Sequence, residues 1–437
     1  MKNISVVGLG KLGACTASCL AYRGFQTLGV DINEEFVDAI NAGSAPVVEP
    51  RLQELISSSE GRLTATDNYD EVVARTDVTL IVVPTPSNDD GHFSDRYLCQ
   101  VLEQLSASLK VSDKDYHLIV ITSTVSPKTC EKTLIPLVEK LSGRRLNEGF
   151  GFCYNPEFIA LGAVVNDTLN PDLVLIGESD QKAGDILDEI YQQMTENEPL
   201  VSRMSIVSAE ITKIALNSFV TMKISFANTL ANICEQIEGS DVDDITSALG
   251  ADRRISPYYL KGGIAFGGPC FPRDNRAFAK FAEEHGLNTP LAKGTDQVNQ
   301  HQSEHLSSIV AQNVKEGDSV GILGLSYKPH TPVVEESPAL MLIDLLLKRN
   351  IKINVYDSLA IENTQAIYQD KVSYKLSKET CIAESDVIVV TTLDAEFKDL
   401  EIPANKDITI IDCWRMFQKE KLTDNVKYFA IGGSSSS

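Results

Sequence analysis

The stretch Ile4-Ser-Val-Val-Gly8-Leu-Gly10-Lys-Leu-Gly13 decides the fold of the first part of the chain. Its apolar start predicts a strand, and a helical pattern follows the glycines as far as Tyr22. A second apolar strand, Thr27 to Val30, ends in Asp31. In such a unit the glycines permit a tight turn and bring pyrophosphate close to a helix N-terminus, while an acid about 20 residues on binds the adenosine ribose. The pattern therefore predicts a dinucleotide-binding fold.

The expected cofactor is NAD. The carboxylate of Asp31 can accept hydrogen bonds from ribose hydroxyls, whereas it would repel the 2′-phosphate of NADP. The predicted cofactor contacts in this unit are Gly8, Gly10, Leu12, Gly13 and Asp31.

Three more strands are predicted, at Val78 to Val83, His117 to Thr122 and Gly151 to Tyr154, and each runs into a turn with hydroxyl or carboxylate groups. Ligands of a doubly wound sheet bind outside the carboxyl ends of its strands, so we expect these turns to face the nicotinamide. Helix capping by Thr124 and a solvated loop position for Glu157 are the alternatives. The candidate residues in the turns are Pro84, Thr85, Thr124, Glu157 and Phe158.

Composition limits the partners. A chain of 437 residues with a net charge of -22 can bury two or three cores, and its acidity argues against nucleic acid or an anionic membrane as partner. Nine cysteines without a CxxC pair argue against a disulfide framework and a thiolate zinc site, so no metal is expected. With no predicted signal peptide and no apolar run of about 18 residues, we expect a cytoplasmic protein.

The strand and helix pattern restarts near the end of the chain. A strand at Ser319 to Leu323 leads into the turn Gly324-Leu-Ser-Tyr-Lys328-Pro, a helix spans Pro338 to Leu347, and a strand at Ile353 to Tyr356 ends at Asp357. Further strands at Val387 to Thr391 and Ile408 to Asp412 complete a second, smaller sheet. The predicted fold class is α/β, with two Rossmann-like doubly wound parallel-sheet domains joined by a long central helix.

This interpretation divides the chain into four parts. Residues 1–204 form an NAD-binding domain, and residues 205–314 form a central helical domain for dimerisation, which carries the cysteine loop. Residues 315–431 form a domain for a nucleotide-bearing substrate, and residues 432–437 form a disordered tail.

The central helix is predicted from Ser205 to Glu238. Lys213 and Asn217 are four residues apart and share one face of it. Apolar residues occupy much of the remaining circumference, which predicts burial on several sides and a homodimer formed through this helix. Surface charge is the alternative role for Lys213.

A glycine-rich loop carries the candidate nucleophile. In Lys261-Gly-Gly-Ile-Ala-Phe-Gly-Gly-Pro-Cys270-Phe-Pro-Arg-Asp274 a cysteine follows four glycines, and a carboxylate stands one helical turn later. Glycines let backbone approach a reacting centre, which suits a catalytic thiol. A small buried hydrophobic residue is the alternative for Cys270.

Together these motifs resemble the UDP-glucose/GDP-mannose dehydrogenase family over nearly the whole chain. The resemblance rests on GLGKLG, VVPTP, STVSPKT, NPEF, the helix with Lys213 and Asn217, FGGPCFPRD, LSYKP and Asp412-Cys-Trp-Arg415, in that order. It implies that a sugar C6 alcohol is oxidised twice to a carboxylate, with two NAD, through a thiohemiacetal and a thioester on Cys270.

The resemblance also implies roles for individual residues. Lys213 and Asn217 stabilise the developing oxyanion, Asp274 and Thr124 position water or relay a proton, and Glu157 is the base for thioester hydrolysis. Arg254 reaches the substrate across the dimer. The implied substrate contacts are Glu157, Phe158, Lys213, Asn217, Arg254, Tyr259, Lys261, Gly267, Lys328 and Arg415.

Two positions depart from the family pattern. Leu161 stands where many members have a second acid after NPEF, and Glu335 stands where members often have an arginine near the cofactor diphosphate.

The pattern after Cys270 favours UDP-glucose, with GDP-mannose as runner-up and a UDP-N-acetylhexosamine as a further alternative. A two-electron hydroxyacid or 6-phosphogluconate-type dehydrogenase and a non-catalytic NAD-binding regulator are the alternative classes. The presence of Cys270 together with Lys213 disfavours both, because a two-electron enzyme has no use for a nucleophilic thiol and a regulator need not retain both residues.

Overall fold

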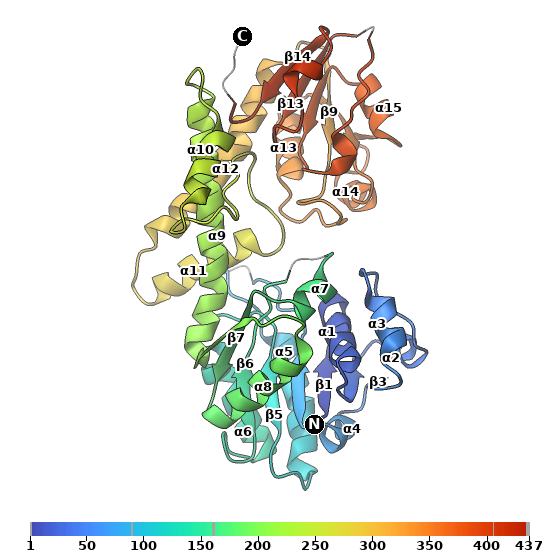
Figure 1. Cartoon of the computed structure of the whole chain (residues 1–437), viewed down its shortest axis with the longest axis vertical. Helices are drawn as coiled ribbons and strands as arrows, with labels where there is room; N and C mark the ends of the chain where they lie inside the picture. The colour runs from blue at the N-terminus through green and yellow to red at the C-terminus, as the bar shows by residue number, and fades with distance from the viewer. Residues whose placement is uncertain (1, 89–90, 160–161, 405, 434–437) are drawn as a thin grey trace. The chain divides into compact units, whose positions relative to one another are not determined.

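The computed structural model describes residues 2–88, 91–159, 162–404 and 406–433 (Figure 1). The chain divides into two compact units, residues 1–214 and 215–437, with the division inside the long helix α9 (Ile206–Cys234). The predicted fold class is confirmed, because each unit holds a Rossmann-like sheet and α9 joins the two units.

Unit 1 contains an eight-stranded sheet in the order β3-β2-β1-β4-β5-β6-β7-β8. Its strands are β1 (Ile4–Val7), β2 (Thr27–Val30), β3 (Leu63–Thr66), β4 (Val78–Ile81), β5 (Leu118–Ile121), β6 (Gly151–Tyr154), β7 (Leu173–Glu178) and β8 (Leu200–Ser205). Its helices are α1 (Lys11–Tyr22), α2 (Glu34–Asn41), α3 (Leu52–Ser58), α4 (Tyr69–Arg75), α5 (Arg96–Val111), the π-helix η1 (Cys130–Leu134), α6 (Ile135–Ser142), α7 (Val164–Leu169) and α8 (Gln181–Met194).

The strands β1, β2, β4, β5 and β6 of unit 1 are buried on both faces. Val6 packs into a core with α1 and α8, and its neighbour Val7 packs into a second core with α5 and α6. Val120 and Ile121 divide between the same two cores. Successive side chains of a strand point to opposite faces, so a sheet covered on both sides needs the continuous apolar runs seen in the sequence.

One junction of this sheet is not parallel. β7 pairs with β6 in the antiparallel sense, while β7 and β8 are parallel to each other. The strand β6 therefore has parallel β5 on one side and antiparallel β7 on the other. Apolar runs reveal a strand but not its direction, so the sequence does not predict this reversal.

Unit 2 contains most of α9 and a six-stranded parallel sheet in the order β11-β10-β9-β12-β13-β14. Its strands are β9 (Ser319–Leu323), β10 (Lys352–Tyr356), β11 (Ser373–Tyr374), β12 (Val387–Val390), β13 (Ile408–Asp412) and β14 (Val426–Ala430). Its other helices are α10 (Val242–Ala251), α11 (Phe271–Glu284), α12 (Pro290–Gln312), α13 (Pro338–Leu347), α14 (Ile361–Tyr368), α15 (Lys378–Ala383) and the 3-10 helices η2 (Ala395–Phe397) and η3 (Lys419–Lys421).

The observed α9 ends four residues before the predicted end. After Cys234 the backbone changes to tighter turns, in which Gln236 N donates to Ile233 O and Ile237 N donates to Cys234 O. The Ser240 hydroxyl also donates to Cys234 O at 3.1 Å. These bonds take the carbonyls that a longer helix would have used.

The end of the chain is tied to unit 2 at Gly432. Its N–H donates to the Glu235 carboxylate at 3.0 Å, and its carbonyl accepts from Val242 N. The predicted tail began at this residue; residues 434–437 lie outside the described part of the chain.

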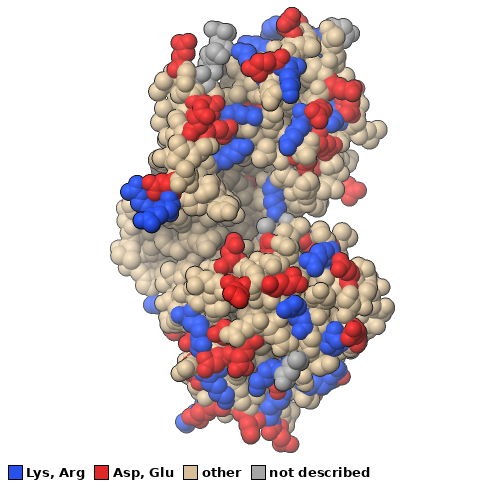
Figure 2. Space-filling model, in the orientation of Figure 1, with Lys and Arg blue, Asp and Glu red and all other residues tan. Residues whose placement is uncertain are grey.

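Charges of both signs are mixed over the visible face of each unit (Figure 2). Among the helices of the described residues, none combines the length and the hydropathy that crossing a bilayer requires.

Candidate active site

The turn between β1 and α1 is shaped for a pyrophosphate. Gly8 has φ +94°, and a Cβ there would lie 2.3 Å from Val82 O. A Cβ on Gly13 would lie 1.7 Å from Gly8 O, so both positions require glycine. At Gly10, the N-cap of α1, a Cβ would meet nothing within 4 Å, and no side chain caps the helix there. The open helix N-terminus and its unsatisfied N–H groups suit an anion.

Asp31 lies directly beside this turn. Its Oδ2 accepts a hydrogen bond from Leu9 N at 2.5 Å, and its Oδ1 accepts from Asn33 N at 2.8 Å. The carboxylate is thereby fixed next to the glycines, as a ribose acceptor must be. Leu12 packs partly buried against the core under the first turn of α1. These residues fit NAD, which supplies a hydride acceptor when bound.

The turns after β4 and β5 are tied together. The Thr85 hydroxyl donates to Thr124 O at 2.7 Å. The Ser123 hydroxyl accepts from Val83 N at 2.9 Å and donates to Val83 O at 2.7 Å. Pro84 lies between these two connections. The structure thus brings together the candidate residues of both turns at the carboxyl edge of the sheet.

Glu157 and Lys213 meet in the same unit. The Lys213 ammonium donates to the backbone oxygen of Glu157 at 2.6 Å and lies 4.6 Å from the centre of the Phe158 ring. Tyr191 donates to Asn155 Oδ1 at 2.7 Å, with Glu157 Oε1 at 3.5 Å. Burial raises the pKa of Glu157 to about 7, against the opposing effects of the Lys213 charge and the Tyr191 hydroxyl. Lys213 is buried, so the surface-charge alternative does not hold.

Glu210 is a buried residue of this region that the sequence analysis missed. It lies on α9, one turn before Lys213. Its carboxylate accepts from Lys128 N at 2.6 Å and from Cys130 N at 2.9 Å, directly after the turn that holds Thr124. Lys128 has φ +74°, and the π-helix η1 begins at Cys130. An acid in a largely apolar helix was the available signal, because such a charge needs buried partners.

Cys270 stands at the start of α11 in unit 2. It is the N-cap residue, and its carbonyl accepts from Asp274 N at 2.8 Å. Asp274 is fully buried, and its Oδ2 accepts from Asn217 Nδ2 at 2.6 Å. Its Oδ1 accepts from Arg273 Nε at 3.2 Å. The structure therefore joins three of the predicted catalytic residues, and a helix N-terminus favours negative charge at the cysteine.

The cysteines differ sharply in exposure. All nine lie within the described residues; seven are buried, Cys99 is partly buried and Cys270 is exposed. Burial raises the pKa of Cys15 to about 12, and it also raises the pKa of Cys381 to about 12. Buried thiols of this kind are inert. The buried-hydrophobe alternative for Cys270 does not hold.

The loop from 252 to 270 carries four of the predicted substrate contacts. Arg254 pairs with Asp252 at 2.6 Å, and both lie at the surface. The Tyr259 ring meets Phe271 edge-on, with 5.9 Å between ring centres, and Lys261 is exposed. A Cβ on Gly267 would lie 2.1 Å from Glu336 O, which explains the glycine by packing.

Lys328 and Arg415 also lie in unit 2. The Lys328 ammonium lies 5.8 Å from the centre of the Tyr327 ring. Arg415 forms a two-fold ion pair with Asp243, at 2.7 and 2.8 Å, and donates to Gly262 O at 2.7 Å. Its Nη1 atom donates to Ile431 O, directly after β14. These four bonds use four of the five guanidinium N–H groups, so only one N–H of Nη1 could bond a diphosphate without breaking any of them.

Of the two departures from the family pattern, Leu161 lies outside the described residues. At the other, Glu335 O accepts from Gly268 N at 3.2 Å, and the neighbouring Glu336 carboxylate accepts from Arg276 at 2.8 Å. This segment therefore contacts the cysteine loop.

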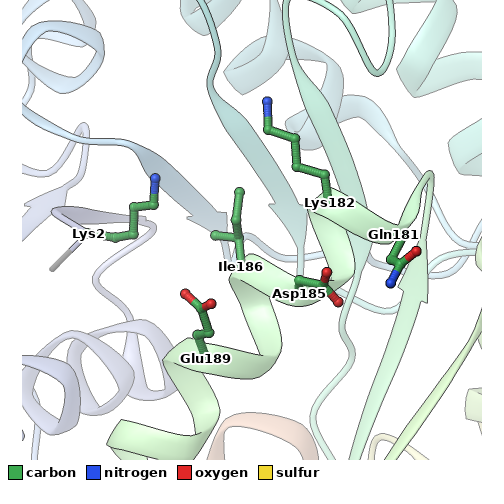
Figure 3. Close-up of a pocket in the computed structure, with 6 residues that line it drawn as sticks. All are labelled: Lys2, Gln181, Lys182, Asp185, Ile186 and Glu189. Atoms are coloured by element: carbon green, nitrogen blue, oxygen red, sulfur yellow. The ribbon is translucent and has the colours of Figure 1, made fainter.

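A hollow elsewhere in unit 1 lies between Lys2, ahead of β1, and the helix α8 (Figure 3). Lys2 marks the amino end of β1, opposite the glycine turn. Lys182, Asp185 and Glu189 give the hollow both signs of charge, and Asp185 is paired with Arg203. Among the described residues, no group of His, Cys, Asp or Glu side chains is arranged to hold a metal ion.

Unit 1 has the fold and the glycine turn of a dinucleotide-binding domain, and unit 2 adds an exposed cysteine at a helix N-terminus. Comparison with known proteins agrees with the first feature. Residues 2–195, 207–301 and 321–419 match the NAD binding, central and UDP binding domains of the UDP-glucose/GDP-mannose dehydrogenase family.

Full-length relatives extend this match. UDP-glucose 6-dehydrogenase AglM of Haloferax volcanii is 35% identical, over 97% of this chain and 99% of the relative. GDP-mannose 6-dehydrogenase of Pseudomonas putida is 31% identical, over 94% and 95%. The solved structure of a UDP-glucose dehydrogenase from the archaeon Pyrobaculum islandicum is 30% identical, over 99% and 98%, with a TM-score of 0.89. The chain belongs to the UDP-glucose/GDP-mannose dehydrogenase family. It is an NAD-dependent oxidoreductase.

Proposed function

We propose that this protein oxidises the C6 alcohol of UDP-glucose to the carboxylate of UDP-glucuronate, with two NAD per sugar. The observation that carries the proposal is the exposed Cys270 at the start of α11, next to the buried pair Asn217 and Asp274. A two-electron oxidation needs no such thiol, whereas passage from aldehyde to acid does.

The thiol makes the second oxidation feasible. Loss of a hydride from C6 and of the hydroxyl proton gives an aldehyde. The Cys270 sulfur adds to its carbonyl carbon, and loss of a second hydride and a proton from the resulting thiohemiacetal gives a thioester. Attack by water breaks the carbon–sulfur bond, releases the acid and returns the thiol.

Lys213 and Asn217 stabilise negative charge on the substrate oxygen. The ammonium of Lys213 is already held by the Glu157 carbonyl, so it is oriented before substrate binds. The amide of Asn217 is likewise held by Asp274. Side chains fixed in this way lose little freedom in the transition state.

Glu157, Asp274 and Thr124 handle water and protons. A carboxylate with a pKa of about 7 can accept a proton near neutral pH, which suits Glu157 as the base for thioester hydrolysis. Asp274 and Thr124 position the water or relay the proton. Leu161 offers no second acid, so hydrolysis depends on Glu157.

The remaining contacts bind the substrate. Tyr259, Lys261 and Lys328 bind the diphosphate, and Arg254 reaches the sugar or phosphate from a second subunit. Gly267 and Phe158 shape the sugar pocket. Because four of its five N–H groups are engaged within the protein, we assign Arg415 mainly to holding Gly262 next to Lys261.

The second subunit docks on α9. Phe219, Phe226 and Ile233 recur every seven residues and are exposed on α9 within unit 2. Such an apolar stripe suits a helix–helix contact with a second copy of the chain.

Initial rates with a panel of nucleotide sugars test the substrate. We expect two NADH per UDP-glucose, with GDP-mannose and UDP-N-acetylhexosamines oxidised more slowly; the relative from P. putida makes GDP-mannose the runner-up. One NADH per substrate, or turnover of hydroxyacids only, would contradict the proposal.

Iodoacetamide should label Cys270 faster than the other eight cysteines, and substrate should protect it. Faster labelling of another cysteine would contradict the covalent mechanism.

A further inference from the structure

The loop between α10 and α11 has a strained outer half. Ser256 has φ +70° and Tyr259 has φ +59°, a region that residues with a Cβ adopt at a cost in free energy. Ile255, Tyr258 and Tyr259 are exposed, so no apolar core holds this backbone. Some other interaction must keep the conformation.

Lys223 supplies that interaction from α9. Its ammonium donates to Ile255 O at 3.2 Å, to Ser256 O at 3.1 Å and to Tyr258 O at 2.5 Å. A lysine ammonium has three N–H donors, and here each has a carbonyl of the same loop. The acceptors lie on both sides of the Ser256 backbone and directly before Tyr259.

The inner half of the loop is held differently. The side-chain amide of Asn228 accepts from Gly263 N at 2.8 Å and donates to Ile264 O at 3.0 Å. The amide of Asn299 accepts from Phe266 N at 2.7 Å and donates to Phe266 O at 3.0 Å. These buried amides replace the partners that a strand would give to buried backbone groups.

We propose that Lys223 is a positioning residue, which fixes the outer half of this loop for substrate binding while the inner half independently fixes Cys270. The proposal rests on the proposed function, since it takes Tyr259 and Lys261 as ligands of the nucleotide sugar. Ile255 N and Ser256 N also donate to Asp252 O within the loop. A charge-assisted bond to a carbonyl is stronger than a neutral one, and three of them on one ammonium make Lys223 the main side-chain attachment of residues 255–258.

Lys223→Met removes the donors and keeps the aliphatic stem. We expect the KM for the nucleotide sugar to rise at least about tenfold, with kcat, the KM for NAD and the iodoacetamide labelling rate of Cys270 changed less than about twofold. Lys223→Arg should restore most of the KM because it keeps charged donors. The control Lys280→Met removes a charge from α11, outside this loop, and should leave all four quantities unchanged.

Proteolysis of the full-length protein tests the same point without activity. Trypsin at Arg253 and Arg254 and chymotrypsin at Tyr258 and Tyr259 should cut Lys223→Met at least about fivefold faster than wild type, because cleavage follows local opening. Lys280→Met should be cut at the wild-type rate.

Each outcome decides something. Unchanged proteolysis of Lys223→Met, with or without a higher KM, would overturn the proposal, because Lys223 would then act only by its charge. Slower labelling of Cys270 would overturn the independence of the two halves. If wild type oxidises no nucleotide sugar, the proposed function fails, while the proteolysis result still shows whether Lys223 holds the loop.

Discussion

The two units begin their sheets with the same turn and continue it differently. In unit 1, Gly8 has φ +94°, its N–H donates to Val30 O, and Leu9 N donates to Asp31. In unit 2, Gly324 has φ +92°, its N–H donates to Tyr356 O, and Leu325 N donates to Asp357 at 2.7 Å. After the first turn α1 starts at Lys11, whereas after the second α13 starts only at Pro338.

The delayed helix frees a segment, residues 326–337, for another task. A Cβ on Gly268 would lie 2.5 Å from the Tyr327 ring, and Gly268 N donates to Glu335 O. Burial raises the pKa of the Tyr327 phenol to about 12, and a negative charge on the nearby Cys270 sulfur contributes to this rise. In unit 1 the turn leads directly into a helix N-terminus suited to a pyrophosphate; in unit 2 the segment after the same turn supports the loop of Cys270.

The largest expected effect tests whether unit 2 carries the covalent chemistry. Cys270→Ser should lower formation of the acid by at least roughly 10³-fold, because a serine hydroxyl is a far weaker nucleophile than a thiolate. NAD affinity should be unchanged, since the glycine turn of unit 1 is intact. Steady-state NADH production and NAD titration measure the two effects. NADH production near the wild-type rate would remove the covalent mechanism.

The next effect concerns the support of the cysteine by residues 326–337. Gly268→Ala places a methyl group against the Tyr327 ring at φ +87°, so the loop must shift. Turnover should fall by up to about 10²-fold, as for a misplaced reacting group, and Cys270 labelling should slow. Gly294→Ala is the control, because nothing lies within 4 Å of its Cβ. Equal activity of the two variants would show that the segment does not position Cys270.

A third test compares the roles of Asp31 in unit 1 and Asp357 in unit 2, which follow equivalent strands. Asp31→Asn should raise the ratio of NADP to NAD efficiency by about tenfold, because repulsion of the 2′-phosphate is lost. Asp357 is buried and accepts from Leu325, Leu359 and Ala360, so Asp357→Asn should instead lower stability by about 2 kcal/mol. Cofactor kinetics and urea unfolding distinguish the effects. A change of cofactor preference in Asp357→Asn would break the comparison, and wild-type preference for NADP would refute the role of Asp31.

A fourth test uses pH to examine Glu157. Burial raises its pKa to about 7, so the carboxylate form that serves as base increases as pH rises. The rate of thioester hydrolysis should grow about tenfold between pH 6 and pH 8. Glu157→Gln should lose this rising limb, which single-turnover kinetics can follow. A limb that persists in Glu157→Gln belongs to another group.

The bounds of helices and strands could be predicted from the sequence where the spacing of apolar or capping residues follows directly from the geometry of the element. The bounds of β1, β2, β6, β9, β13 and α13 were predicted correctly, because buried strands are continuous apolar runs and Ser337 caps a helix that starts with Pro338. The motifs assigned Asn217 and Asp274 to one predicted site but paired Asn217 with Lys213 and Asp274 with Thr124, so the 2.6 Å bond between Asn217 and Asp274 was not predicted.

Other features depend on contacts distant in sequence. Nothing near Arg415 in the sequence indicates that Asp243, 172 residues earlier, takes its guanidinium. Lys223 looks like an ordinary charge of a long helix, and Glu210 stands out only as an acid among apolar neighbours, although each holds the backbone of a remote loop. The strand direction of β7 is set by its partners too. Spacing identifies residue types that share a face, but only the fold supplies their partners.

The smallest expected effect on turnover comes from weakening the proposed dimer. If the protein is a dimer, the loop of unit 2 can serve the active sites of both subunits, which unit 1 does not do in this proposal. Ile233 is 47% exposed on α9, and Ile367 is 53% exposed on α14. Ile233→Asp should weaken self-association by roughly tenfold or more, because a charge replaces buried apolar surface, whereas Ile367→Asp should not. Analytical ultracentrifugation measures association. Turnover should fall only as the dimer dissociates.

Mixing two inactive variants shows whether the loop is shared. Cys270→Ser and Arg254→Ala should each be nearly inactive alone. If Arg254 completes the partner's site, a heterodimer has one site in which Cys270 and Arg254 are both intact. Random exchange of equal amounts makes half of the dimers mixed, so about a quarter of wild-type activity should return. Complete exchange without recovery would place Arg254 in the pocket of its own chain or outside the site, and the loop of unit 2 would then serve a single subunit.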